Sequence, residues 1–325
     1  MILILSTDGD VATNDVINWL RFYQQPFVRL NDNDLLRYEF VFSFKENGDP
    51  WFSVQTEAHA FHSDDISVVW FRKFGFYHAL PNFNDINNRM TSSFMYQFKN
   101  EYFGALSLVF LALQHKKWLL RPDQVMPSKM RVLSYALKAG LNIPRSVVLN
   151  SRTGLQQVLQ TNEVITKSLK DCHSFITADH FVTMFTTGVP EELLPQLPET
   201  FLPSLLQQKE EKQYELRIFY LKEQCHTMAI FSQNDAQTEL DFRKYNWQKP
   251  NRYVPFQLPH DLHQKIITLM KSLELDTGSI DMICNTQGEY VFLEVNPCGQ
   301  FAMASRPCHF YLEKIIAEDL MKLSA

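Results

Sequence analysis

Hydrophobic positions along the chain follow two alternating periods, and each period predicts a different kind of element. Short apolar runs such as Ile2–Leu5 and the stretch 39–44 (EFVFSF) are typical of strands, whereas apolar residues between Asn84 and Lys117 recur at helical spacing. The alternation starts again after residue 127. It predicts helices over 130–139, 262–273 and 311–323, and strands within 143–150, 163–169, 214–221 and 289–301. Alternating strands and helices favour an α/β fold.

The last predicted strand contains an acidic residue that its apolar pattern does not explain. In the stretch 289–301 (EYVFLEVNPCGQF), Glu294 stands among apolar residues and Asn296 follows it. Burying an ionised carboxylate costs several kcal/mol unless a partner compensates for it. The pattern therefore predicts a partner for Glu294 on a neighbouring element.

The preceding stretch, 278–288 (GSIDMICNTQG), supplies a candidate partner. Asn285 and Gly288 bracket two residues that suit a hairpin turn. If Asn285 pairs with Gly288, Asp281 lies opposite Phe292 and diagonally across from the acidic residue of the last strand. The two stretches are thus predicted to form a hairpin that brings two carboxylates together.

Alternation along this hairpin places Asp281, Glu294 and Asn296 on one face, together with Phe292. The opposite, apolar face is predicted to carry Ile280, Met282, Cys284, Val291, Leu293 and Val295. Two carboxylates and an amide oxygen are ligands that suit magnesium. The alternative is a pair of surface acids on a solvated face, because a one-residue slip in register would separate the set.

Composition narrows the class of protein. The 325 residues allow two or three domains of about 100–200 residues each. A net charge of −5 gives no global basic excess, which is the usual sign of nucleic-acid binding. We find no signal peptide and no apolar run long enough to span a membrane. The five cysteines are scattered without CxxC spacing, so we expect a cytoplasmic protein without disulfides or zinc.

Magnesium in proteins is often bound together with the phosphates of a nucleotide. Such a nucleotide site would also need cations, and two predicted strands offer them. The chain has no GxxxxGK[ST] motif, which excludes a P-loop. Lys167 ends one predicted strand, where its ammonium group could reach phosphates, or it is simply a solvated strand end. Arg217 and Glu215 share one face of the strand 214–221. Arg217 is therefore either a phosphate clamp or the partner of Glu215 in a structural salt bridge.

The order of these features resembles that of the ATP-grasp ligases. The stretch FLEVNPCGQF looks like the metal-binding strand of that family, and PSKMRVLSYALKAGLNIPRSVV is similar to the entry into its nucleotide-binding half. The stretches STDGDVATNDVINWL, WFRKFGFY and EVNPCGQFAMASRPCHFYLEKIIAEDL more narrowly resemble the graspetide-forming (grasp-with-spasm) peptide maturases. The resemblance covers essentially the whole chain. It implies an N-terminal pre-grasp α/β domain over 1–122 and two ATP-grasp subdomains over 123–203 and 204–325.

The resemblance also implies an activity. Graspetide maturases use ATP to join side-chain carboxylates of a ribosomal precursor peptide to hydroxyls or amines, which forms macrocyclic esters or amides. It implies Mg²⁺ or Mn²⁺, a precursor peptide with a leader segment, and a homodimer that binds neither nucleic acid nor membrane. Two alternatives stay open: an ATP-grasp ligase that adds an amino acid to a small molecule or protein tail, and a non-catalytic ATP-binding scaffold.

Site residues follow from the same resemblance, position by position. It makes Asp281, Glu294 and Asn296 the metal ligands, Lys129 and Lys167 the phosphate contacts, Arg217 the contact of the γ-phosphate and acyl phosphate, and Gln207, Gln208, Lys209 and Glu215 further nucleotide-binding residues. The family often has Gln-Glu where this chain has Gln207-Gln208, which leaves Glu210 or Glu211 to act at the adenine or ribose edge. Within the basic run DFRKYNWQKPNR, Arg243 is expected nearest the reaction, unless this run is a solvated loop.

Overall fold

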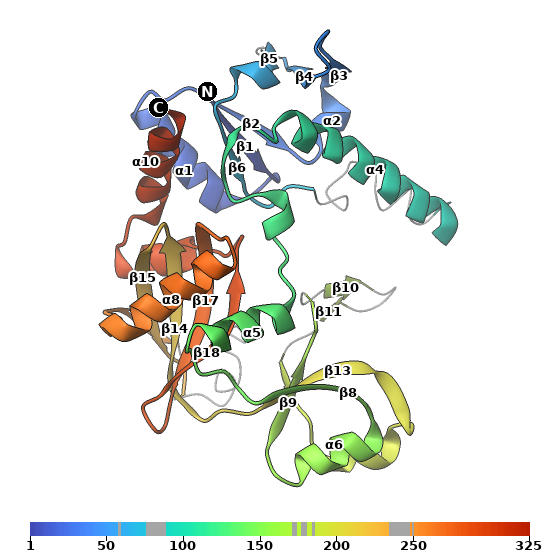
Figure 1. Ribbon diagram of the computed structural model, residues 1–325, viewed down its shortest axis with the longest axis vertical. Coiled ribbons are helices and arrows are strands. Elements are labelled where there is room, and N and C mark those ends of the chain that lie inside the picture. The colour runs from blue at the N-terminus through green and yellow to red at the C-terminus, as the bar shows by residue number, and fades with distance from the viewer. Residues whose placement is uncertain are drawn as a thin grey trace. The chain divides into compact units, whose positions relative to one another are not determined.

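The computed structural model describes the chain except for residues 58–59, 76–88, 171–173, 177–180, 184–185, 234–247 and 249. The described residues form two compact units (Figure 1). The first unit comprises Met1–Val125, Gln300–Ser305 and Tyr311–Ala325, and the second comprises Met126–Gly299 and Arg306–Phe310. Among the described helices, none is long and apolar enough to cross a membrane.

The first unit is built on a parallel four-stranded sheet with the order β2-β1-β6-β7. Its strands are β1 (Ile2–Ser6), β2 (Phe27–Asn31), β6 (Val68–Phe71) and β7 (Lys117–Leu119). Every residue of β1 is buried, as expected for a strand of a parallel sheet covered on both faces. Helix α1 (Val11–Phe22) packs against the C-terminal helix α10 (Leu312–Ser324) beside this sheet (Figure 1).

A second, antiparallel sheet of the first unit has the order β3-β4-β5. Its strands are β3 (Glu39–Phe44), β4 (Pro50–Gln55) and β5 (Ala60–His62), and the helices α2 (Asp34–Arg37) and α4 (Ser92–Ala112) contact them. The hydroxyl of Thr91 accepts a hydrogen bond from the backbone N–H of Phe94 and so caps α4. The helix predicted between Asn84 and Lys117 is confirmed over 92–112, and residues 84–88 lie outside the described part of the chain.

The last predicted helix is confirmed as α10, and it completes the first unit. Its apolar face carries Leu312, Ile316 and Leu320 at four-residue spacing, and all three are buried. The Tyr23 hydroxyl on α1 donates a hydrogen bond to the Glu318 carboxylate on α10 at 2.8 Å. The chain therefore returns to the first unit after passing through the second.

The second unit contains a four-stranded antiparallel sheet with the order β12-β9-β13-β8. Its strands are β8 (Ser146–Ser151), β9 (Val164–Lys167), β12 (Thr187–Gly188) and β13 (Thr200–Gln208), and a hairpin of β10 (Ser174–Ile176) and β11 (Phe181–Thr183) lies between β9 and β12 in sequence. Helix α6 (Arg152–Leu159) covers one face, where Leu155, Val164 and Leu206 form a small core. Lys167, Ile165 and Gln207 alternate onto the other face.

A five-stranded antiparallel sheet completes the second unit, with the order β16-β15-β14-β17-β18. Its strands are β14 (Lys212–Leu221), β15 (Gln224–Phe231), β16 (Arg252–Phe256), β17 (Thr277–Asn285) and β18 (Tyr290–Asn296), followed by α9 (Ala302–Cys308). Helices α5 (Lys129–Lys138) and α8 (His260–Ser272) contact each other beside this sheet (Figure 1). Ile218 and Ile280 pair on the apolar face, so the alternate residues of β14 and β17 form the polar face.

Candidate functional site

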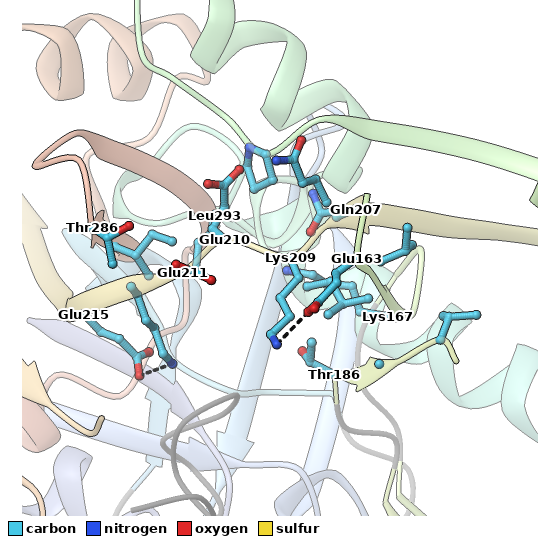
Figure 2. Close-up of a pocket in the computed structure, with 18 of the residues that line it drawn as sticks. Glu163, Lys167, Thr186, Gln207, Lys209, Glu210, Glu211, Glu215, Thr286 and Leu293 are labelled. Carbon is cyan, nitrogen blue, oxygen red and sulfur yellow. Dashed lines mark hydrogen bonds and ion pairs between the residues drawn. The ribbon is translucent and has the colours of Figure 1, made fainter. Parts of the chain in front are cut away.

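A pocket of about 690 Å³ lies between the two sheets of the second unit (Figure 2). The four-stranded sheet contributes Lys167 and Gln207, and the five-stranded sheet contributes Glu215, Ile283 and Leu293. Residues 209–211, which connect β13 to β14, line the pocket together with the strand ends Gln208 and Lys212. The pocket thus opens where one sheet passes into the other.

Backbone hydrogen bonds hold the start of this connection in place. The backbone N–H of Gln208 donates to the Arg145 carbonyl at 2.9 Å, and that of Lys209 donates to the Glu163 carbonyl at 2.8 Å. The Lys209 ammonium group also pairs with the Glu163 carboxylate at 2.9 Å (Figure 2). Residues 207–209, which were predicted to bind the nucleotide, are therefore anchored to the residues that precede β8 and β9, and they reach the pocket in a defined conformation.

The side-chain amide of Gln207 has one orientation that satisfies its neighbours. The Ser146 hydroxyl lies 2.7 Å from the Pro144 carbonyl, which can only accept, so Ser146 donates there. The Gln207 amide lies 2.8 Å from the Ser146 oxygen and must donate to it through Nε2. Its Oε1 is then left buried without a hydrogen-bond partner in the described structure, although Gln207 lines the pocket. Such an oxygen accepts from a ligand's N–H group, which a nucleobase amino group supplies.

The polar face of the five-stranded sheet brings the predicted metal ligands together. Asp281 on β17 lies directly opposite Glu294 on β18, and Ser279 lies opposite Asn296. Directly opposed residues on antiparallel strands point to the same side of the sheet. The common face predicted for Asp281, Glu294 and Asn296 is thus confirmed, while their role as ligands stays a prediction.

The register of the hairpin differs from the sequence-based expectation by two shifts of one residue each. Asp281 was expected opposite Phe292, but it lies opposite Glu294. The turn pairs Asn285 with Glu289 instead of Gly288, which shifts the register by one residue, and a β-bulge between Asp281 and Met282 inserts one extra residue into β18. Phe292 consequently pairs with Met282 on the apolar face and is fully buried. The expected places of Val291 and Leu293 on that face are wrong, since Val291 pairs with Ile283 on the other face and Leu293 lines the pocket. Together, the two shifts move the carboxylates from diagonal to directly opposed positions.

Two cations neutralise these carboxylates. The Arg217 guanidinium donates to the Asp281 carboxylate at 2.6 Å across β14 and β17. The Lys129 ammonium group lies 3.8 Å from Glu294 and donates to the Ser168 carbonyl at 3.1 Å. Both cations were predicted to bind phosphates, so the arrangement joins the predicted phosphate contacts to the predicted metal ligands.

The alternative pairing of Arg217 with Glu215 is wrong, since Glu215 has other partners. The Lys212 ammonium group donates to the Glu215 carboxylate at 2.7 Å, and the Ser232 hydroxyl donates to the same oxygen at 2.9 Å. Burial raises the pKa of Glu215, the Lys212 charge and these two hydrogen bonds lower it, and the Asp281 charge raises it again. The net effect is a raised pKa of the Glu215 carboxyl group, which lines the pocket (Figure 2).

The donor set at the hairpin fits a magnesium ion. Its groups are two carboxylates and an amide, all oxygen donors, and one more buried oxygen, Ser279 Oγ, has no hydrogen-bond partner among the described residues. Within the described ranges, no three His, Cys, Asp or Glu side chains gather to hold a metal by themselves. A metal here would therefore need the amide of Asn296 and water or phosphate oxygens.

Other predicted residues fall outside this description, and some contributors escaped prediction. Arg243 lies within 234–247, outside the described residues. Sequence reasoning overlooked Ser146, Lys212, Ser232 and Ser279, which are ordinary polar residues in or beside strands. Lys212 could have been found from its three-residue spacing to Glu215, whereas the serines carry no sequence signal.

Comparison with solved structures identifies the class of this fold. A ligase from Chryseobacterium gregarium, described as a RiPP-associated ATP-grasp ligase in complex with ADP and a leader and core peptide, superposes with a TM-score of 0.87 at 24% identity, over 99% of this chain and 96% of that one. The macrocyclase MdnC of Microcystis aeruginosa MRC, bound with precursor peptide MdnA, has a TM-score of 0.83 at 25% identity over 99% of both chains. The chain has the ATP-grasp fold, as the resemblance implied.

Other solved structures superpose on this chain less closely. The D-cycloserine synthetase DcsG covers 98% of this chain but has a TM-score of 0.54 and 12% identity. No protein-family model matches the chain, and neither does any curated protein sequence. The similarity is therefore carried by structure over the full length.

Proposed function

We propose that this chain is an ATP-dependent carboxylate ligase that modifies a ribosomal precursor peptide. The observation that carries the proposal is the face on which Asp281 and Glu294 oppose each other, each beside a cation, next to a pocket formed by two sheets. The full-length likeness to MdnC and the Chryseobacterium ligase supports the peptide as substrate. The amino-acid ligase alternative has less support, because the small-molecule synthetase DcsG is much less similar.

In this proposal each of the two sheets contributes residues that contact part of the nucleotide. Gln207, Gln208 and Lys209 contact the adenine, and Glu215 contributes to the nucleotide site through its pair with Lys212. Lys129 and Lys167 bind the phosphates, and Asp281, Glu294 and Asn296 hold Mg²⁺ or Mn²⁺. A bound metal would neutralise phosphate charge and orient the γ-phosphate for in-line attack. PsnB, another similar ligase, was solved with Mg and ADP, which supports this assignment.

The reaction has two steps that this chain would promote by charge and position. A side-chain carboxylate of the peptide attacks the γ-phosphorus of ATP, releasing ADP and forming an acyl phosphate. A hydroxyl or amine of the peptide then attacks the acyl carbon, phosphate leaves, and an ester or amide forms. Arg217 is proposed to stabilise the charge on the transferring phosphoryl group, and Arg243 to bind the peptide carboxylate.

The remaining assignments are proposals of the same kind. The segments 1–122, 123–203 and 204–325 are proposed as the pre-grasp domain and the two ATP-grasp subdomains. A leader segment of the precursor is proposed to bind the enzyme, which works as a homodimer in the cytoplasm. MdnC and the Chryseobacterium ligase, solved with precursor, leader or core peptides, support the leader but leave the dimer to be measured.

Co-expression with candidate precursor peptides tests the proposed function directly. The chain is expressed with each short open reading frame encoded beside its gene, and the intact peptides are weighed by mass spectrometry. A true precursor is expected to lose one water per bond formed, and fragmentation then locates the links. Unchanged peptide masses, together with magnesium-dependent ATP binding, would point to a carboxylate ligase with another substrate.

Replacing Ser146 with alanine is expected to relax the preference for ATP over GTP. Without Ser146, the Gln207 amide can turn and offer its amino group to the oxygen that guanine carries in place of the adenine amino group. The ratio of the two dissociation constants, measured by calorimetry, should narrow about tenfold, the equivalent of one hydrogen bond. Ser204→Ala is the matched control, since Ser204 also donates to a carbonyl two residues earlier. An unchanged ratio in Ser146→Ala would exclude this role.

A further inference from the structure

A buried hydroxyl without a hydrogen-bond partner lies beside the proposed metal ligands. Ser279 is 1% exposed, and its Oγ has no partner among the described residues. It lies on β17 two positions before Asp281, directly opposite Asn296 on β18. Ser279 therefore points to the same face as the proposed ligands.

Packing against a turn encloses this hydroxyl. The backbone N–H of Gly299 donates to the Asn296 carbonyl at 3.0 Å and closes the turn that follows β18. A Cβ atom on residue 299 would lie 2.2 Å from the Cβ of Ser279 and 2.3 Å from its Oγ. The turn thus lies directly on Ser279 and excludes a larger residue at position 299. Any hydrogen bond to this hydroxyl must come from a group already next to it.

An unsatisfied buried hydroxyl is rare and destabilises a folded protein, so an alanine at position 279 would fit the same space at lower cost. The described structure offers no stabilising role for the oxygen atom of Ser279. A buried polar group that destabilises the ligand-free protein and adds nothing to its packing is typical of a binding site, where the ligand-bound protein makes use of it. The neighbouring ligand set is the nearest candidate for that use.

The chemistry of an amide ligand supplies the missing partner. An asparagine side chain has one acceptor oxygen and one donor amino group, and only the oxygen can bind magnesium. The Asn296 backbone is held by the turn, whereas its side chain is exposed and makes no hydrogen bond to the described residues. Directly opposed residues have Cβ atoms about 4.5–5.5 Å apart, which is within reach of a serine–asparagine hydrogen bond.

We propose that Ser279 is a positioning residue: its hydroxyl accepts a hydrogen bond from Asn296 Nδ2 and thereby turns Asn296 Oδ1 toward the magnesium ion. The inference rests on the proposed function, and it gives Ser279 the role that outer hydrogen-bond partners have at metal sites. The two carboxylate ligands need no such help, because both oxygens of a carboxylate can bind a metal.

The test measures how much Mg²⁺ the full-length protein needs for stabilisation by ADP. Melting temperature is followed over a Mg²⁺ titration at constant ADP, for wild type and Ser279→Ala. We expect the midpoint of the titration to rise about tenfold in Ser279→Ala. The melting temperature without ligands should be equal or higher, because the variant no longer buries an unsatisfied hydroxyl. A residue that only packs would instead lower that temperature and leave the midpoint unchanged.

A second background separates orientation from other effects. In Asn296→Asp the ligand has two equivalent oxygens, so adding Ser279→Ala to it should leave the Mg²⁺ midpoint unchanged. Thr227→Val is the matched control: Thr227 is 2% exposed, its hydroxyl also has no partner among the described residues, and it lies on the opposite face of the sheet. This control should keep the wild-type midpoint.

The possible outcomes distinguish a failure of the proposed role of Ser279 from a failure of the proposed function. A normal wild-type response with an unchanged midpoint in Ser279→Ala would overturn the role of Ser279 and leave the proposed function standing. An equal rise in the Asn296→Asp background would also overturn it, because orientation of the amide could not then be the cause. A wild-type protein that gains no stability from Mg²⁺ and ADP would overturn the proposed function and this inference together.

Discussion

Glu294→Gln is expected to abolish magnesium-dependent stabilisation by ATP and, with it, the loss of water from a precursor peptide. The substitution keeps the side-chain volume but removes the charge that the proposed magnesium ion and Lys129 share. A ligand that binds the native state at a hundred times its dissociation constant stabilises it by about 2.7 kcal/mol. Wild type should show a gain of this order in denaturant unfolding with Mg²⁺ and ATP, and Glu294→Gln should show almost none.

The control for Glu294→Gln is a second carboxylate that lies away from the proposed metal ligands. Glu223→Gln removes a carboxylate at the far turn between β14 and β15, where Glu223 pairs with Lys271, and it should respond to Mg²⁺ and ATP like wild type. If Glu294→Gln keeps the full gain while Glu223→Gln also keeps it, the metal lies elsewhere. The acidic pair would then be a surface feature of the hairpin, which is the alternative that the sequence left open.

Arg217→Met is expected to destabilise the empty protein, to be partly rescued by Mg²⁺, and to lose activity. Removing the guanidinium takes its positive charge away from Asp281, which lies directly opposite Glu294, so two negative charges face each other with less compensation. Breaking a buried ion pair costs about 3–5 kcal/mol, and we expect about 2–3 kcal/mol because 21% of the Asp281 side chain is exposed. Magnesium would neutralise both carboxylates and should restore much of this loss.

Measurements of activity distinguish the proposed catalytic role of Arg217 from its contribution to stability. If Arg217 also stabilises charge on the transferring phosphoryl group, peptide conversion should fall about 100- to 1000-fold even at saturating Mg²⁺. The measurements are denaturant unfolding with and without Mg²⁺ and single-turnover conversion of the peptide. Arg121→Met is the control, since Arg121 is 47% exposed and 3.9 Å from its acidic neighbour Asp123. Equal stability of Arg217→Met and wild type in the absence of Mg²⁺ would contradict the assignment.

Much of the fold could be predicted from the periods of the sequence. Helices α5, α8 and α10 and the strands of the terminal hairpin lie where helical spacing and alternation place them. The common face of Glu294 and Asn296 follows from alternation along β18. These predictions succeed because they depend on local backbone geometry, which each segment carries in its own residues.

Only the tertiary structure could decide which distant residues meet. The bulge that sets Asp281 directly against Glu294, the pairing of Arg217 with Asp281 instead of Glu215, and the return of α10 to the first unit all depend on neighbours from other elements. The chain of hydrogen bonds from Pro144 through Ser146 to Gln207 joins residues more than sixty positions apart. Serines such as Ser146 and Ser279 resemble any other serine in a strand, because a hydroxyl acquires its role from the atoms packed around it.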